Sequence, residues 1–528
     1  MFKKSTFLLA SLACLSGSLH ANENGGPSYN IIPEPVRIEQ KQGMTQNLRF
    51  DIKNAKLDPS LGAEGYALDI TPQGISIRYA DKRGLENAKI TILQLEDQLG
   101  ASPAGIPCGT ITDKPAYAWR GMMCDVARSF MPLEDLKKFV DVMHFYKFNV
   151  LHLHLTDDQG WRFPVPGYDR LKTVASTRGP GDGGGPGWMP ASSGMYTAQE
   201  LKELVAYCKA RGIDVVPEID VPGHNQALCE AYPELFCQNP SADKVEAFKQ
   251  TQAYTSKNDA QKQELLTAPQ DVKIRRSGGV SYHLLCPQSK EMWKFYEAAV
   301  KQLSDIFPGK IIHLGGDEAP AERWELCAAC TEARKAKGQK NTNEEMRGFF
   351  KDMTSLLAKY GKEAQFWFEL EDDFYQKGQT VYTWRLGKTP ATVNATKKAG
   401  LKLVLTPGEH CYLDYPQLPG HSNRGWMPMV TLEKCYQLDP TQGKPADQVD
   451  HIVGVHCTLW AEQLPTLEHT LYRAYPRAMA VAEKGWSPKS AWSWERFQQK
   501  MEAHKKPFEK RFGYTLERTR DNEPAVKP

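Results

Sequence analysis

Two adjacent carboxylic acids, Asp317 and Glu318, follow an apolar segment and two glycines in the run His-Leu-Gly-Gly-Asp-Glu at 313–318. If that apolar segment is a buried strand, both acids lie at its carboxyl end, where barrel enzymes hold their catalytic groups. Consecutive residues point in different directions, so one carboxyl group could donate a proton while the other positions a substrate. The pair could instead simply begin a helix, because negative charge is favourable near the positive end of the helix dipole.

Polar and aromatic residues recur after other apolar segments. In chain order they are Asp125, Arg128, His152, His154, Asp157, Asp158, Asp220, His224, Trp367, Trp384, Tyr412, Asp414, Trp460 and Glu462. Aromatic rings stack on the C–H faces of a sugar, while carboxylates and an arginine give its hydroxyl groups directional partners. A single tryptophan is more often a core residue, but three of these follow separate predicted strands beside carboxylates. The pattern therefore favours a carbohydrate site.

A metal site is the main alternative. His152 and His154 alternate along one predicted strand, so both imidazoles lie on one face, and with Asp157 and His224 they could bind the metal ion of a barrel hydrolase. Metal-dependent amidohydrolases usually carry such a pair on the first strand, whereas this pair falls on the second. We therefore favour structural histidines and expect no metal or cofactor. A non-catalytic carbohydrate-binding protein is a third possibility, and the intact acid pair argues against it.

Eight apolar segments alternate with helical segments after Trp119, which predicts an α/β fold, a (β/α)₈ TIM-type barrel. The predicted strands are 121–127, 149–156, 214–220, 310–318, 363–370, 380–385, 402–407 and 451–460. Helical periodicity is found, among other places, at 133–148, 197–211, 343–360 and 466–484.

The remaining segments predict a domain order. Residues 1–21 resemble a signal peptide, and 22–114 a small α/β domain of the α+β sandwich type, with strands at 66–70 and 75–79 and a helix at 85–99. The barrel is expected over 115–490, with a polar, lid-like insertion at about 241–279. A C-terminal helix and tail complete the chain at 491–528.

Composition and the N-terminal sequence limit which partners and which cellular compartment we expect for this protein. The chain has 528 residues, 24% of them charged, and a formal net charge of +3, which gives no reason to expect nucleic acid. Two lysines precede an apolar run at 7–15 that is too short to cross a bilayer. We expect export to the periplasm or the exterior with no stable membrane span, and we disfavour a lipid anchor at Cys14.

Cysteine usage adds one expectation. Twelve cysteines, one of them in the signal segment, leave an odd number in the mature chain. Cys327 and Cys330 have the spacing of a redox pair or half a zinc site, but the sequence shows no second pair to complete a metal site. A local disulfide beside the catalytic loop is expected in an oxidising compartment.

Four ordered motifs resemble glycoside hydrolase family 20, the β-N-acetylhexosaminidases. They are the run at 313–318, His-Leu-Thr-Asp-Asp-Gln-Gly-Trp-Arg at 154–162, Asp-Val-Pro-Gly-His at 220–224, and the segment from Arg120-Gly121 to Arg128. The resemblance implies a retaining exo-enzyme that releases terminal GlcNAc or GalNAc from glycans. It also implies substrate-assisted catalysis, in which the sugar's own acetamido oxygen is the nucleophile.

The same resemblance implies roles for single residues. Glu318 would be the general acid and base, Asp317 would hold the acetamido N–H, and Tyr412 would bind the acetamido oxygen. Asp157 and His224 would orient Glu318. The implied substrate-binding residues are Arg128, His154, Trp367, Trp384, Trp460, Asp414 and Glu462. The chain departs from the family pattern around Trp367, where it reads Phe-Trp-Phe-Glu, and at Ser129, where a histidine is common.

Overall fold

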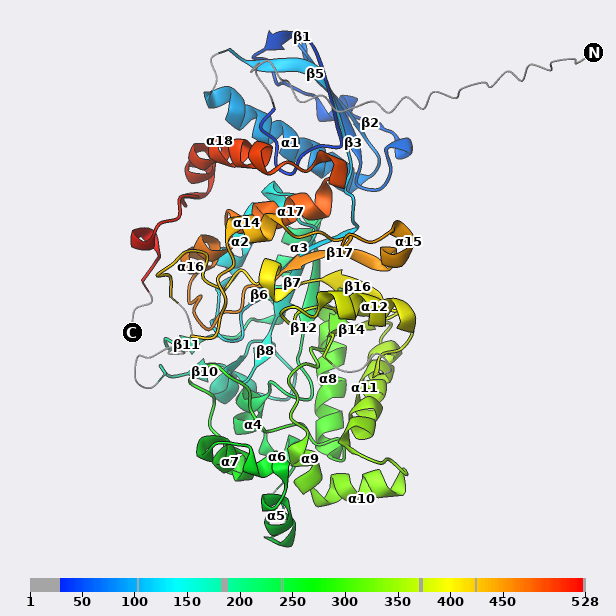
Figure 1. The fold of residues 1–528 in the computed structure, drawn as a ribbon, viewed down its shortest axis with the longest axis vertical. Coiled ribbons are helices and arrows are strands. Elements are labelled where there is room, and N and C mark those ends of the chain that lie inside the picture. Colours follow the sequence, from blue (N-terminus) through cyan, green and yellow to red (C-terminus); the bar gives the residue numbers. More distant parts are fainter. Residues whose placement is uncertain are drawn as a thin grey trace, which may run out of the picture.

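The computed structural model describes residues 29–525 except 102–103, 182–188, 239, 241, 370–373 and 423–424. A small domain lies at one end of an elongated molecule, a barrel occupies the middle, and a group of short helices forms the other end (Figure 1). The predicted signal segment lies outside the described residues.

The small domain is a five-stranded sheet with one helix. Its strands are β1 (Arg37–Thr45), β2 (Lys56–Leu57), β3 (Tyr66–Thr71), β4 (Gly74–Tyr79) and β5 (Ile106–Asp113), arranged in the order β1-β5-β3-β4-β2. Helix α1 (Lys82–Ala101) packs Ala88, Ile92 and Leu95 against the apolar face of this sheet. Alternating side chains on β3, with Leu68 and Ile70 buried, explain why this segment was recognisable as a strand.

A closed barrel of eight parallel strands confirms the predicted fold class. The strands are β6 (Trp119–Asp125), β7 (Val150–His154), β12 (Asp214–Glu218), β13 (Ile311–His313), β14 (Glu363–Trp367), β15 (Thr380–Tyr382), β16 (Lys402–Leu405) and β17 (Ile452–Cys457). Each lies within a predicted strand or overlaps it. Because β13 ends at His313, Asp317 and Glu318 lie in the loop beyond the strand.

Helices surround the barrel and cover its strands. The principal ones are α2 (Leu133–Phe145), α3 (Ala198–Ala210), α8 (Lys290–Ile306), α11 (Thr342–Lys359), α12 (Thr389–Ala399), α14 (Leu432–Tyr436), α15 (Ala446–Val449), α16 (Leu467–Ala474) and α17 (Arg477–Trp486). The single helix predicted at 466–484 is wrong, because α16 and α17 are separate. Pro476 lies between them; it has no N–H to donate and disfavours helical geometry in the residue before it.

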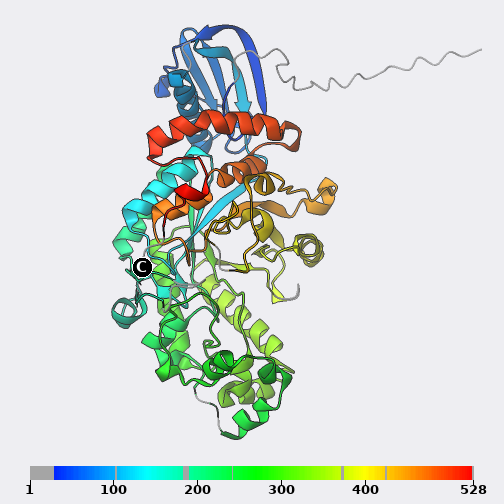
Figure 2. The ribbon, with the colours of Figure 1, turned by 60° about the vertical axis from the view of Figure 1, so that its left-hand side comes forward.

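The long loops after β12 and β13 form the end of the molecule away from the small domain (Figures 1 and 2). They contain α4 (Gln226–Ala231), α5 (Ala242–Lys249), α6 (Gln252–Thr255), α7 (Asp259–Leu266), α9 (Glu322–Leu326) and α10 (Ala328–Ala336). Phe248, Leu265 and Leu326 share a small apolar core, so the polar insertion packs on the loop that follows the acid pair. Shorter elements elsewhere are β8 (Thr156–Asp157), β9 (Gly160–Trp161), β10 (Thr177–Arg178), β11 (Ser192–Ser193) and α13 (Gly408–Cys411).

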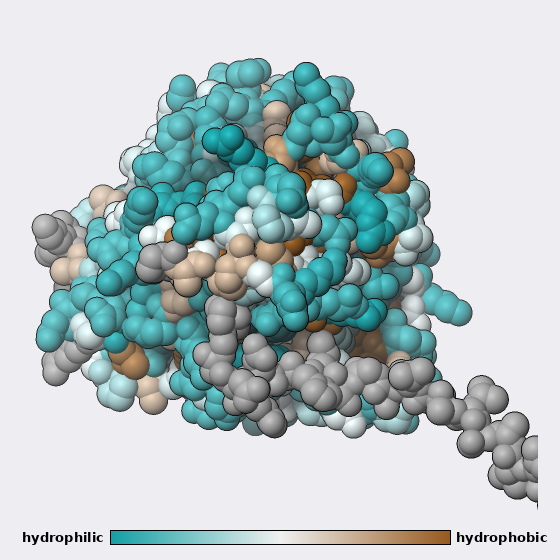
Figure 3. Space-filling model, turned by 90° about the horizontal axis from the view of Figure 1, so that it is seen from above, coloured by the Kyte–Doolittle hydropathy of each residue, from teal (hydrophilic) through white to brown (hydrophobic). Residues whose placement is uncertain are grey.

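Helix α18 (Trp494–Phe512) lies across the junction of the small domain and the barrel (Figures 1 and 2). His504 hydrogen-bonds the carbonyl of Asn30 at 3.0 Å, and Arg511 pairs with Asp97 of α1. Seen from the small-domain end, the surface is mostly hydrophilic, with hydrophobic residues in small groups (Figure 3). Among the described residues, no helix has the length and apolar character needed to cross a membrane.

Candidate active site

A cavity of about 370 Å³ opens at the carboxyl ends of the barrel strands. Most of the residues singled out in the sequence line it, although they come from loops far apart in the chain. The lining residues are Arg128, Asp157, Asp220, His224, Gly278, Gly279, Val280, Asp317, Glu318, Trp384, Tyr412, Asp414, Trp426, Met427, Trp460 and Glu462. Concave sites with aromatic walls and a few convergent polar groups are typical of small-molecule binding.

The turn after β13 depends on its two glycines. Gly315 and Gly316 have φ values of +62° and +91°, and a Cβ atom on Gly315 would lie 2.1 Å from the carboxylate of Asp220. The N–H of Gly316 donates to Asp220 Oδ1 at 3.1 Å. This tight turn leaves Glu318 in the left-handed region, with φ of +48°, a conformation uncommon for residues with a side chain.

The two adjacent acids occupy different environments. Asp317 is 8% exposed, and its Oδ1 has no hydrogen-bond partner among the described residues. Burial raises the pKa of Asp317 to about 7, although nearby His224 acts in the opposite direction. The side chain of Glu318 is 42% exposed. Two carboxyl groups in one site with such different surroundings are suited to different chemical roles.

His224 connects this acid pair to a buried carboxylate. Its Nε2 lies 3.7 Å from Glu318 Oε2 and 4.0 Å from Asp317 Oδ2, while its Nδ1 lies 3.3 Å from Asp157 Oδ1. Burial alone would lower the pKa of His224, but Asp157 raises it well above the usual value. The charged imidazolium form of His224 is therefore favoured, and carboxylates lie on both sides of it.

Asp157 also binds the arginine of the cavity wall. Arg128 Nη2 lies 2.9 Å from Asp157 Oδ2, its Nη1 lies 3.2 Å from Asp125 Oδ2, and its guanidinium lies 5.0 Å from the ring centre of Trp460. Burial opposes the charged form of Asp157, yet Arg128 and His224 together lower its pKa. The Nε of Arg128 lies 3.7 Å from Glu462 on the same wall.

Aromatic side chains and another buried acid, Asp414, also line the cavity. Tyr412 and Trp460 lie with their ring centres 6.3 Å apart. Burial, together with nearby Glu462, raises the pKa of Asp414 to about 8, so that this acid is mainly protonated at neutral pH. Trp426 is 60% exposed at the rim. The sequence analysis did not identify Trp426, whose only local signal is an aromatic residue in a long loop after β16.

Trp367 and His154 lie beneath the cavity and do not line it. Trp367 is 1% exposed, donates to Glu218 Oε1 at 2.8 Å and packs against Trp460 with ring centres 5.7 Å apart. His154 is fully buried, and its two nitrogens contact Glu218 and Asp157 at 2.6 and 2.9 Å. Neither residue lines the cavity in this structure, and both contact residues that do line it. Their role in substrate binding stays a prediction.

Glu218 holds several side chains beneath the cavity, and the sequence analysis did not identify it. Besides His154 and Trp367, its carboxylate contacts His152 Nε2 and His313 Nδ1, each at 3.0 Å. Burial opposes ionisation, but His154, His313 and His152 lower the pKa of Glu218 well below its usual range. The only signal in the sequence was its place at the end of the third predicted strand.

These contacts disfavour the metal-hydrolase alternative. His152 contacts Glu218 and is not grouped with Asp157 and His224, and both nitrogens of His154 already have carboxylate partners. The four residues therefore do not converge on one point, as metal ligands must.

Ser129, at the position where the family pattern has a histidine, donates its hydroxyl to the carbonyl of Ala461 at 2.8 Å.

A second cavity, of about 700 Å³, adjoins the first at Glu318. One side is formed by the insertion and the segment after it, including Gln261, Glu264 and Tyr282. The other side includes Glu369 and Arg385, which form an ion pair. Neither of these two residues was singled out in the sequence, and Glu318 is the acid that both cavities share.

Replacing Glu218 by Gln keeps the size of the side chain but removes the charge that holds three imidazoles. We expect Glu218→Gln to lose about 3–5 kcal/mol of unfolding free energy at pH 7, because a buried charge network is left incomplete. The folded-state pKa of Glu218 is lowered, so this stabilisation is present above about pH 4.5 and disappears as the pH falls towards the folded pKa. Urea denaturation at two pH values tests it, with the exposed Glu495→Gln as control. Equal stability of Glu218→Gln and wild type at pH 7 would contradict the assignment.

Comparison with known families agrees with this geometry. The model of the catalytic domain of glycosyl hydrolase family 20 matches residues 117–489, and the model of that family's domain 2 matches residues 35–114. The chain is 50% identical to a beta-hexosaminidase of Akkermansia muciniphila over 94% of each chain. It is 30% identical to a beta-N-acetylhexosaminidase of Cellulomonas fimi, over 87% of this chain and 81% of the relative.

Solved structures give the same result. A crystal structure of a beta-N-acetylhexosaminidase superposes with a TM-score of 0.87 at 50% identity, covering 95% of this chain and all of the other. A mutant beta-hexosaminidase of Streptomyces plicatus in complex with its product GlcNAc gives a TM-score of 0.73 at 26% identity, over 94% and 97% of the two chains. The chain belongs to glycosyl hydrolase family 20.

Proposed function

We propose that this protein is a retaining exo-β-N-acetylhexosaminidase that releases terminal β-linked GlcNAc or GalNAc from glycans. The observation that carries the proposal is a buried Asp317 carboxylate with an oxygen that has no hydrogen-bond partner in the described part of the chain, directly beside the exposed acid Glu318 in an aromatic-walled cavity. Family membership supports it, because this family uses the acetamido group of its substrate as nucleophile.

Glu318 is the general acid and then the base of this reaction. It protonates the glycosidic oxygen as the acetamido oxygen attacks the anomeric carbon, and it afterwards takes a proton from the water that opens the oxazolinium ring. The imidazolium of His224, 3.7 Å away, is held by Asp157 and orients the carboxyl group of Glu318. His224 and Asp157 act through Glu318 as positioning residues.

Asp317 and Tyr412 hold the acetamido group. Asp317 Oδ1 accepts the amide N–H, which fills its missing hydrogen bond and stabilises the positive charge that develops on the oxazolinium. The hydroxyl group of Tyr412 donates to the acetamido oxygen. Fixing this group over the anomeric carbon replaces an enzyme nucleophile by proximity.

The remaining lining residues bind the sugar ring. Trp384 and Trp460 supply aromatic faces, while Arg128, Asp414 and Glu462 hydrogen-bond its hydroxyl groups. With its raised pKa of about 8, Asp414 can donate as well as accept a hydrogen bond at neutral pH. The leaving group must lie on the proton-donating side of Glu318, which makes the second cavity the place for the rest of the glycan.

We also propose that the protein is exported. The support is the sequence alone, namely two lysines followed by a short apolar run and small residues before position 22. N-terminal sequencing of the protein recovered from cell fractions tests this. A chain in the periplasm or medium that begins at or near residue 22 is expected, and an intact N-terminus in the cytosol would refute export.

The proposed reaction requires the acetamido group. We expect hydrolysis of an aryl β-N-acetylglucosaminide but not of the matched β-glucoside, and inhibition by a thiazoline that mimics the oxazoline intermediate. Asp317→Asn should lower kcat about 10²–10³-fold. Glu318→Gln should lower the rate most for poor leaving groups, which depend on protonation.

Three results would count against the mechanism. Equal hydrolysis of both aryl glycosides would exclude acetamido participation and would revive the metal-hydrolase alternative. Binding without turnover would favour a carbohydrate-binding protein. Full activity of Glu318→Gln on a natural disaccharide would remove Glu318 from its role, with Glu495→Gln as the matched surface control.

The raised pKa of Asp317 predicts a pH dependence. If Asp317 must be ionised to hold the acetamido N–H, kcat/KM should fall as the pH drops through about 7, because the free enzyme then carries the neutral acid. Bound substrate favours the ionised form, so the corresponding limb in kcat should lie at lower pH. Initial rates from pH 4 to 9 test this, and Asp317→Asn should lose the limb. An unchanged limb in that variant would assign it to another group.

A further inference from the structure

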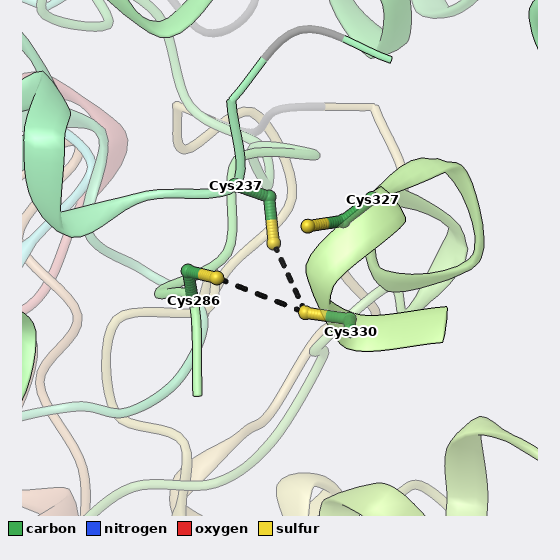
Figure 4. A group of neighbouring side chains, drawn as sticks. All are labelled: Cys237, Cys286, Cys327 and Cys330. Atoms are coloured by element: carbon green, nitrogen blue, oxygen red, sulfur yellow. Dashed lines mark hydrogen bonds between the residues drawn. The ribbon is translucent and has the colours of Figure 1, made fainter. Parts of the chain in front are cut away.

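Four cysteines from three separate segments meet beside the active-site loops. Cys237 follows the short turn after α4, Cys286 precedes α8, and Cys327 and Cys330 lie at the start of α10. Figure 4 shows the four sulfur atoms pointing toward a common centre. All four residues are buried, and their sulfur atoms lie within 4.8 Å of one another. The sequence analysis saw only the last two and expected a disulfide between them.

The spacing of the sulfur atoms is that of a metal site rather than of disulfides. Cys330 Sγ lies 3.7 Å from both Cys237 Sγ and Cys286 Sγ. Four zinc–sulfur bonds of about 2.3 Å in tetrahedral geometry place the sulfur atoms about 3.8 Å apart, whereas a disulfide needs about 2.05 Å. All eleven cysteines in the described part of the chain are free thiols, so the predicted disulfide between Cys327 and Cys330 is wrong.

The surroundings favour a cluster that carries negative charge. Cys327 is the N-cap residue of α10 and Cys330 lies in its first turn, where the positive end of the helix dipole stabilises thiolates. Arg323, 1% exposed, donates to the carbonyl of Cys237 at 3.1 Å and brings a buried positive charge next to the group. Four buried thiolates need such compensation as well as a cation.

We propose that Cys237, Cys286, Cys327 and Cys330 bind one structural zinc ion. A closed set of four cysteine ligands leaves no open position for substrate or water, so the metal has no part in the hydrolysis, and the inference is independent of the proposed function. Zinc fits better than iron here because the group is buried, with no described partner for electron transfer.

The position of the site indicates what the metal stabilises. Cys237 and Cys286 close the base of the segment that contains α5, α6 and α7, and this segment returns to the active-site cavity at Gly278–Val280. Cys327 follows Glu318 by nine residues in the loop after β13. The zinc ion therefore ties the insertion to the loop that carries the catalytic acid, on the leaving-group side of the site.

Metal analysis of the full chain, purified without chelator or added metal, tests the proposal. We expect about one zinc per chain by elemental analysis, released when a mercurial modifies the thiols. Cobalt substitution should give the sulfur-to-metal charge-transfer bands of a tetrahedral thiolate site. Cys330→Ser should lower the zinc content at least about tenfold, whereas Cys208→Ser, a buried cysteine of α3 outside the group, should keep it.

The readouts remain decisive if Cys330→Ser folds poorly, because zinc content, mercurial release and the cobalt spectrum are measured on wild-type protein. Absence of zinc together with thiols missing in pairs would show disulfides and overturn the proposal. A coloured, iron-containing protein would overturn the choice of metal. Cobalt bands without sulfur charge transfer would place the metal elsewhere.

Discussion

The buried carboxylate of Glu218 is the interaction on which the barrel interior and the base of the active site both depend. It lies on β12 and contacts side chains from β7, β13 and β14, so one charge joins four neighbouring strands. A charge removed from water is tolerated only with full compensation, which here comes from imidazole and indole N–H groups. Trp367 is held by this carboxylate and packs on Trp460, so the position of the cavity base depends on the barrel core.

From Glu218 a chain of alternating charges runs outward to Glu318. His154 connects Glu218 to Asp157, and Asp157 connects Arg128 and His224, which faces Glu318. Each ionised group has an opposite charge as its neighbour, and this arrangement lowers the pKa of Asp157 and raises that of His224. Asp317 stands at the end of this chain. One of its oxygens has no hydrogen-bond partner among the residues that the structure describes, and burial raises its pKa.

Local sequence signals predicted the fold and most of the cavity. Buried parallel strands are continuous apolar runs, and all eight were recognisable for that reason. Residues just after those runs gather at one end of any such barrel, so Arg128, Asp157, His224 and the acid pair were placed together before any contact was known. The side-chain alternation of a strand gives the face of a residue but not its depth, so it did not show that Trp367 and His154 are buried beneath the residues that line the cavity.

The sequence by itself determined the barrel, the two adjacent acids and the order of the motifs, because each depends on periodicity or on neighbours along the chain. Only the tertiary structure decided which carboxyl group is buried and which exposed, why Glu218 has partners on three other strands, and how Cys237 and Cys286 reach Cys327 and Cys330. These features depend on contacts between segments tens of residues apart. Burial, and with it pKa and metal-ligand geometry, is a property of the packed interior that no local pattern encodes.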